Sequence, residues 1–144
     1  MEPCIRERTE LEMIDFISRL ADSVNKIDGL PFKTKTDYIT ETDSLGIYAL
    51  PGGRTIQSDM LGNRDIERIF EIVIKTKDNQ LASQTLELIY DHLSQDDIQI
   101  DSTNGSYEFE KLALTEPSLN DRDEDGYYIV LLDVTATLYL EKEK

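Results

Sequence analysis

The pattern that comes closest to a known chemical site is an acidic run, Asp121-Arg-Asp123-Glu-Asp125-Gly126. It matches the first half of an EF-hand calcium loop, in which alternate aspartates supply oxygen ligands and a glycine permits a sharp bend. The second half does not match, because the twelfth position should be a bidentate glutamate and is Leu132. We therefore interpret Asn120–Gly126 as a solvated turn between strands and expect no calcium site.

The residue types that most often carry catalysis or bind zinc occur singly. His92 is the only histidine and Cys4 is the only cysteine. A zinc site built on several thiolates and a disulfide within the chain are therefore excluded. His92 has no second histidine or serine elbow to form a triad with. We expect it in the last turn of a helix, where it would interact favourably with the helix C-terminus.

The glycine-rich segment Pro51–Arg54 could suggest a phosphate-binding loop. It lacks the pattern G-x-x-x-x-G-K-[ST] and does not precede a helix. We interpret it as a turn between strands. Paired carboxylates follow from a composition with 30 acidic residues, so they do not indicate acid–base catalysis. The sequence therefore predicts no enzyme, no cofactor and no metal.

The charge balance restricts the partners of this chain. Its 144 residues carry 15 basic and 30 acidic side chains, a formal net charge of −15. Such a surface repels nucleic-acid phosphates and anionic membranes, because affinity for both comes from lysine and arginine contacts. The sequence contains neither an 18-residue apolar run nor the charged-then-apolar order of a secretory signal. We expect a soluble protein made in a reducing cytoplasm.

Two amphipathic helices are predicted. The first spans Glu10–Lys26 and has capping-box spacing at Thr9 and Glu12. The second spans Asn79–Ser94 and is preceded by Asp78, a residue type that caps helices well. Apolar residues recur at intervals of three or four along both helices, at Leu11, Ile14, Ile17, Ala21, Val24 and Ile27, and at Ala82, Leu86, Ile89 and Leu93.

The remaining periodic segments predict strands, because apolar residues alternate with polar ones or form short runs bounded by turn residues. The longest has an unbroken apolar face of alternate residues from Tyr128 to Leu140. A short edge strand and four longer strands are predicted at Phe32–Thr36, Leu45–Leu50, Ile66–Thr76, Tyr107–Leu114 and Tyr127–Leu140.

These elements predict a fold class. The order α-β-β-β-α-β-β indicates a single α/β domain of the α+β type over residues 1–144. We expect one mixed or antiparallel sheet of four to five strands, with two helices packed on one face. Thr55–Asn63 carries little pattern and is interpreted as a loop or frayed strand.

The second half of the chain resembles a known protein family. Phe70–Leu93 reads as a strand, a short polar turn and a helix with Q-x-A-x-x-x-x-L-x-x-I-Y-x-x-L. Asn104–Leu138 adds an acidic turn and a long final strand, and Leu45–Arg54 adds a strand followed by P-G-G-R. These features are similar to those of the minor capsid and tail terminator (tail completion) proteins of long-tailed bacteriophages and of prophages.

The resemblance implies a structural virion protein without substrate or cofactor. Tail terminators assemble as rings, usually hexameric, at the head-proximal end of the tail. The implied partners are copies of the same chain, the tail tube protein and the head–tail connector, at the head–tail junction of a virion assembled in the bacterial host cytoplasm. DNA would pass through the ring without specific binding, and an acidic lumen would not hold it.

Two other functions remain open at this point. One is a neighbouring phage role, such as a head–tail joining protein. The other is an acidic protein-binding module, an inhibitor or DNA mimic, which would be a monomer that binds a basic partner in a salt-sensitive way.

The segment Pro51–Asn63 leads to a more specific hypothesis. It holds three glycines, one proline and few apolar residues, so we expect it to be mobile in an isolated subunit. It would become ordered at a contact between subunits. Arg54 and Arg64 are the candidate subunit-interface residues, pairing with acidic groups of the next copy.

Overall fold

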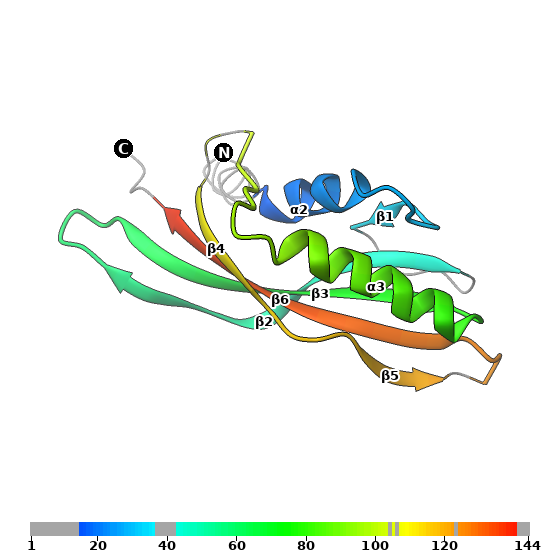
Figure 1. The fold of residues 1–144 in the computed structure, drawn as a ribbon. Coiled ribbons are helices and arrows are strands. Elements are labelled where there is room, and N and C mark those ends of the chain that lie inside the picture. Colours follow the sequence, from blue (N-terminus) through cyan, green and yellow to red (C-terminus); the bar gives the residue numbers. More distant parts are fainter. Residues whose placement is uncertain (1–14, 37–42, 104, 106, 123, 141–144) are drawn as a thin grey trace, which may run out of the picture.

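One curled sheet carries the two helices of the described residues on the same face (Figure 1). The computed structural model describes residues 15–36, 43–103, 105, 107–122 and 124–140. In chain order the elements are α2 (Phe16–Asn25), β1 (Thr34–Lys35), β2 (Ser44–Ser58), β3 (Arg64–Thr76), α3 (Asn79–Leu93), β4 (Glu108–Leu114), β5 (Ser118–Arg122) and β6 (Tyr128–Leu140).

The sheet has the strand order β1-β2-β3-β6-β4. It is mixed, because β1 is parallel to β2 and all other pairs are antiparallel. The short strand β5 also pairs with β6, alongside Tyr128–Leu131, while β4 pairs with the part that follows, Val134–Tyr139. With β3 on the other side of β6, β4 and β5 share one edge, and the sheet is five strands wide. The predicted α+β class is confirmed.

The core lies between the sheet and the two helices. Alternate side chains of β6 from Val130 to Leu140 are buried, as the apolar alternation predicted. The helices contribute the buried residues Phe16, Leu20, Ala21 and Val24 from α2, and Ala82, Leu86, Ile89 and Leu93 from α3. Aromatic rings close one end of this core: Phe16 lies 5.1 Å from Phe70 and 5.6 Å from Tyr107 between ring centroids.

The ends of the described helices follow local chemistry. The side chain of Asp78 caps α3 by accepting a hydrogen bond from the Leu81 amide at 3.1 Å, as predicted. The first helix ends at Asn25, one residue before the predicted end. Thr9, Glu12 and the other predicted helical residues before Asp15 lie outside the described residues, as does Cys4.

The prediction of a turn at Pro51–Arg54 is wrong. These residues lie within β2, at a shift in its register with β3: Leu50 pairs with Ile69, and Arg54 pairs with Glu67. Three residues of β2, 51–53, therefore stand opposite one residue of β3, Arg68, which makes a bulge. Gly52 has a φ of +110°, which favours glycine. A Cβ on Gly53 would lie 2.7 Å from the carbonyl oxygen of Glu67. Gly52 and Gly53 therefore permit a bulge within one continuous strand, and do not form a turn between two strands.

Thr55–Asn63, interpreted as a loop or frayed strand, is partly each: β2 continues to Ser58, and residues 59–63 form the turn before β3 begins at Arg64. Backbone pairing with β3 within the same chain holds residues 54–58 of the segment for which mobility is predicted. The sequence pattern gave little sign of this strand, because two strands of a hairpin are held by backbone hydrogen bonds to each other and do not require alternating apolar residues. The resulting hairpin extends past α2 and α3 at one end of the molecule (Figure 1).

Strand β5 was not predicted. Its residues 118–122 overlap the predicted turn Asn120–Gly126, so only the later part of that segment forms the turn. No helix in the described part of the chain is long and apolar enough to cross a membrane.

Candidate assembly surfaces

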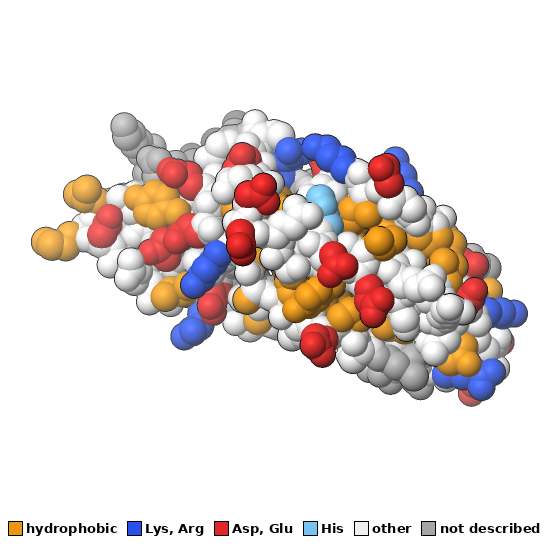
Figure 2. Space-filling model, in the orientation of Figure 1, with side chains coloured by type: hydrophobic (Ala, Val, Ile, Leu, Met, Phe, Trp, Pro, Cys, Tyr) orange, Lys and Arg blue, Asp and Glu red, His pale blue; other side chains and the backbone are white. Residues whose placement is uncertain are grey.

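Two surfaces stand out on the described part of the molecule: a protruding β-hairpin and a groove beside α3. We call residues 51–68 the arm. Its apolar side chains are few, and every residue from 51 to 62 is exposed. At its end, Met60 is fully exposed and Leu61 is 72% exposed. Figure 2 shows hydrophobic side chains at this extremity of the molecule.

Polar contacts fix the end of the arm. The carboxylate of Asp59 accepts hydrogen bonds from the backbone amides of Leu61 and Asn63, both at 2.9 Å, and from the Asn63 side chain at 3.0 Å. The bond from the Asn63 side chain is the main cause that lowers the pKa of Asp59. The turn is therefore stabilised by an ionised aspartate, and Met60 and Leu61 are presented on a defined backbone.

The two arginines predicted at a subunit interface both lie in the arm. Arg54 donates from Nε to Oε1 of Glu67 at 2.9 Å, within its own chain. Arg64 begins β3 and pairs in register with Ser58 and Leu140. It is exposed and forms no ion pair with another described residue. The structure brings Arg54 and Arg64 onto one hairpin, and their contact with another copy stays a prediction.

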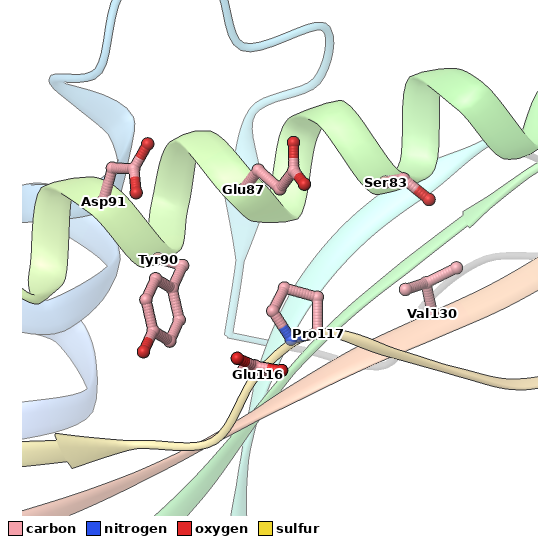
Figure 3. Close-up of a pocket in the computed structure, with 7 residues that line it drawn as sticks. All are labelled: Ser83, Glu87, Tyr90, Asp91, Glu116, Pro117 and Val130. Carbon is pink, nitrogen blue, oxygen red and sulfur yellow. The ribbon is translucent and has the colours of Figure 1, made fainter.

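The groove is formed by α3, the segment between β4 and β5, and β6. Its volume is about 560 Å³, and it is lined by Ser83, Glu87, Tyr90, Asp91, Glu116, Pro117 and Val130. In Figure 3 the Tyr90 ring extends from α3 toward Glu116 and Pro117, and Val130 lies along β6. The lining thus combines three apolar groups with three exposed carboxylates, on Glu87, Asp91 and Glu116.

Sequence reasoning missed the groove, because its residues come from three separated segments. The end of the arm did carry a signal. Met60 and Leu61 are large apolar residues between turn-forming Asp59 and Gly62, where a solvent-exposed turn is usually polar.

His92 joins the two helices. Its Nε2 lies 2.9 Å from the Ser23 hydroxyl oxygen of α2, and the hydrogen bond links α3 to α2. Burial lowers the pKa of His92, so the neutral ring is favoured. No carboxylate that the structure describes is bonded to the other ring nitrogen, so the pair lacks the acid that orients a catalytic histidine. The prediction of His92 in the last helical turn is confirmed.

The acidic run at Asp121–Asp125 is described in part. Asp121 and Arg122 belong to β5 and pair in register with Ile129 and Tyr128. Asp123 lies outside the described residues, as does the side chain of Asp121. Within the described residues, no three acidic, histidine or cysteine side chains are grouped to hold a metal. The expected lack of calcium binding stays a prediction.

A pair of carboxylates faces away from the helices. Glu71 of β3 and Asp133 of β6 are direct partners in the register. Burial raises the pKa of Glu71, and the charge of Asp133 raises it further. One oxygen of Asp133, Oδ1, is buried and has no hydrogen-bond partner in the described structure. A proton on Glu71 would supply that donor, so the pair can share a proton.

The described part of this α+β fold thus presents an exposed apolar hairpin end and a groove, and holds no group of metal-binding side chains. A family model described as bacteriophage tail terminator protein matches residues 23–140. The chain belongs to the bacteriophage tail terminator family. The resemblance inferred from the sequence is thereby confirmed.

Two further comparisons bear on the fold and on known relatives. A solved structure with 17% sequence identity matches with a TM-score of 0.52, covering 89% of this chain and 93% of that one. At this identity the match supports the fold alone. No curated protein matches the sequence.

Proposed function

We propose that this protein assembles as a ring of identical copies at the head-proximal end of a phage tail. There it ends the growth of the tail tube and docks the tail to the head. The observation that carries the proposal is membership of the tail terminator family over residues 23–140. A phage tail structural role follows from that membership directly, and the ring, hexameric in the virion, is the proposed form.

The architecture supports assembly. The arm extends past the helix-covered core and holds exposed apolar side chains. The partners are further copies of the chain, the tail tube protein and the head–tail connector, in a virion assembled in the bacterial host cytoplasm. DNA passes through the ring without specific contacts, since a net charge of −15 per copy repels phosphates.

Negative-stain microscopy of the purified protein, alone and mixed with tail tubes of the same phage, tests this function. We expect rings of uniform diameter, with one ring at one end of each tube. A phage lacking the gene should make tubes of uncontrolled length that do not join heads. Protein that decorates tubes along their length, or tails of normal length without it, would contradict the proposal.

A further inference from the structure

The end of the arm is an apolar projection with a defined shape. Met60 and Leu61 are exposed at a turn held by three hydrogen bonds to Asp59. Large apolar side chains at an exposed turn gain free energy only when another surface covers them. Because the turn is already ordered, little conformational entropy is lost when that surface arrives.

The groove beside α3, of about 560 Å³, has apolar groups that could cover this projection. Tyr90 and Pro117 line it, and Val130 is buried beneath it. The arm leaves the molecule at one end of the sheet, whereas the groove lies over α3 and the start of β6, beside β5 (Figures 1 and 3). The end of the arm therefore does not cover the groove of its own chain.

The charges of the two surfaces also match. Residues 51–68 hold three arginines (Arg54, Arg64 and Arg68) and three acids (Asp59, Asp65 and Glu67), a net charge of zero. The whole net charge of −15 therefore lies outside the arm. An uncharged arm approaches an acidic surface without the repulsion that the rest of the chain would meet.

Arg64 adds an attraction near the apolar end. It lies three residues from Leu61, where the turn ends and β3 begins. Glu87, Asp91 and Glu116 at the groove form no ion pair with another described residue. When Met60 and Leu61 enter the groove, Arg64 follows directly behind them, where its long side chain can pair with an acid at the groove edge.

We propose that Met60 and Leu61 of one copy insert into the groove formed by Tyr90, Pro117 and Val130 of the next copy, with Arg64 paired to a carboxylate at the groove edge. This inference rests on the proposed ring and names the contact that closes it. Because each copy would give one arm and receive one, the contact is heterologous and generates a ring when the rotation closes.

Two variants separate the halves of this contact. Met60→Asp with Leu61→Asp removes the apolar projection, and Ser83→Trp fills the groove from an exposed helical position. Gln84→Trp is the matched control, because Gln84 is the next exposed residue of α3 and does not line the groove. All four positions are exposed, so the melting temperature of each variant should stay close to that of the wild type.

Native mass spectrometry of each protein and of an equal mixture gives the test. We expect rings from the wild type and from Gln84→Trp, and monomers from the arm variant and from Ser83→Trp. Their mixture should give dimers and nothing larger, because the intact arm of one fits the intact groove of the other and no second contact is possible.

A cysteine pair provides an independent measurement. In a Cys4→Ser background, Leu61→Cys with Ser83→Cys should form disulfide-linked multimers on oxidation, because a disulfide requires Cα atoms within about 7 Å. Leu61→Cys with Gln84→Cys should form far fewer.

The outcomes distinguish this contact from the ring itself. Rings from the arm variant or from Ser83→Trp, or a mixture that stays monomeric, would overturn the contact and leave the ring. If the arm variant forms normal rings that fail to bind tail tubes, the arm contacts the tube protein instead. That result would also overturn the contact between copies. Wild-type protein that forms no ring in solution or on tubes would overturn the proposed function, and the contact with it.

Discussion

The strands β2 and β3 pass through two regions that are stabilised in different ways. Near their inner ends, Leu45 and Ile47 pair with Ile74 and Ile72, and all four are buried beneath the helices. Toward the turn the same two strands form the arm, in which residues 51–62 are exposed. The inner region gains free energy from buried apolar area, about 25 cal/mol per Å². The arm has backbone pairing and a few polar contacts.

The difference indicates what each region is for. An isolated two-stranded hairpin is marginally stable in water, so the arm depends on the buried parts of the strands that it continues. A region that contributes so little to the core and yet extends from it is suited to contact another molecule. The comparison predicts that stability and assembly respond to different substitutions.

The largest expected effect is on the buried region. Leu132→Ala on β6 removes a side chain with no exposed area and should lower the free energy of unfolding by about 2–5 kcal/mol. Leu61→Ala in the arm should change it by less than about 0.5 kcal/mol. Urea denaturation followed by circular dichroism measures both. Equal losses from the two substitutions would remove the distinction between core and arm.

A smaller effect is expected at the junction of the two regions. Gly53→Ala places a Cβ 2.7 Å from the carbonyl oxygen of Glu67, so the bulge must shift at a cost of about 1–3 kcal/mol. Hydrogen exchange should show faster exchange of arm amides on β2 while the amides of β6 stay protected. Thr55→Ala, on the same strand, is the control. Uniformly faster exchange over the whole sheet would show that the arm and the core unfold together.

The carboxylate pair on the open face of the sheet should respond to pH. Since burial and then Asp133 raise the pKa of Glu71 in the fold, ionised Glu71 destabilises the protein at pH 7. As pH falls through the pKa of Glu71 in the folded protein, Glu71 takes up a proton and the free energy of unfolding increases. Glu71→Gln should therefore raise the melting temperature at pH 7 by on the order of a degree or two. The gain should disappear below the usual pKa of 4.5.

Glu124→Gln, at an exposed turn, removes the same charge and serves as the control for the net-charge effect. A gain of equal size from both variants would show that the pairing with Asp133 contributes nothing.

The smallest effect is expected on the helix side. Burial lowers the pKa of His92 below its usual 6.5, so the unfolded chain binds the proton more readily. Stability from this group is present above pH 6.5 and is lost as pH falls through the folded pKa. His92→Gln keeps a hydrogen-bonding partner for Ser23. It should flatten the dependence of the melting temperature on pH between about 5 and 7.5, the range in which histidine changes its charge. An unchanged profile would show that His92 does not titrate with folding.

Much of the fold followed from the sequence alone. Regular apolar spacing predicted β6 and α3 to within a residue or two, and the aspartate before α3 predicted its cap. These features are local, because the periods of helices and strands are set by backbone geometry. The family resemblance was also readable from the chain, and the family model confirms it.

The tertiary structure decided the arm and the groove. Strand pairing depends on hydrogen bonds to a distant segment, so P-G-G-R became a bulge within β2 where local rules favoured a turn. The groove required α3, the β4–β5 connection and β6 to meet. Arg54 and Arg64 could be chosen from the sequence as rare cations, but their place on one hairpin depended on β2 pairing with β3. Spatial proximity between distant segments comes from chain packing, which the local pattern of residues does not encode.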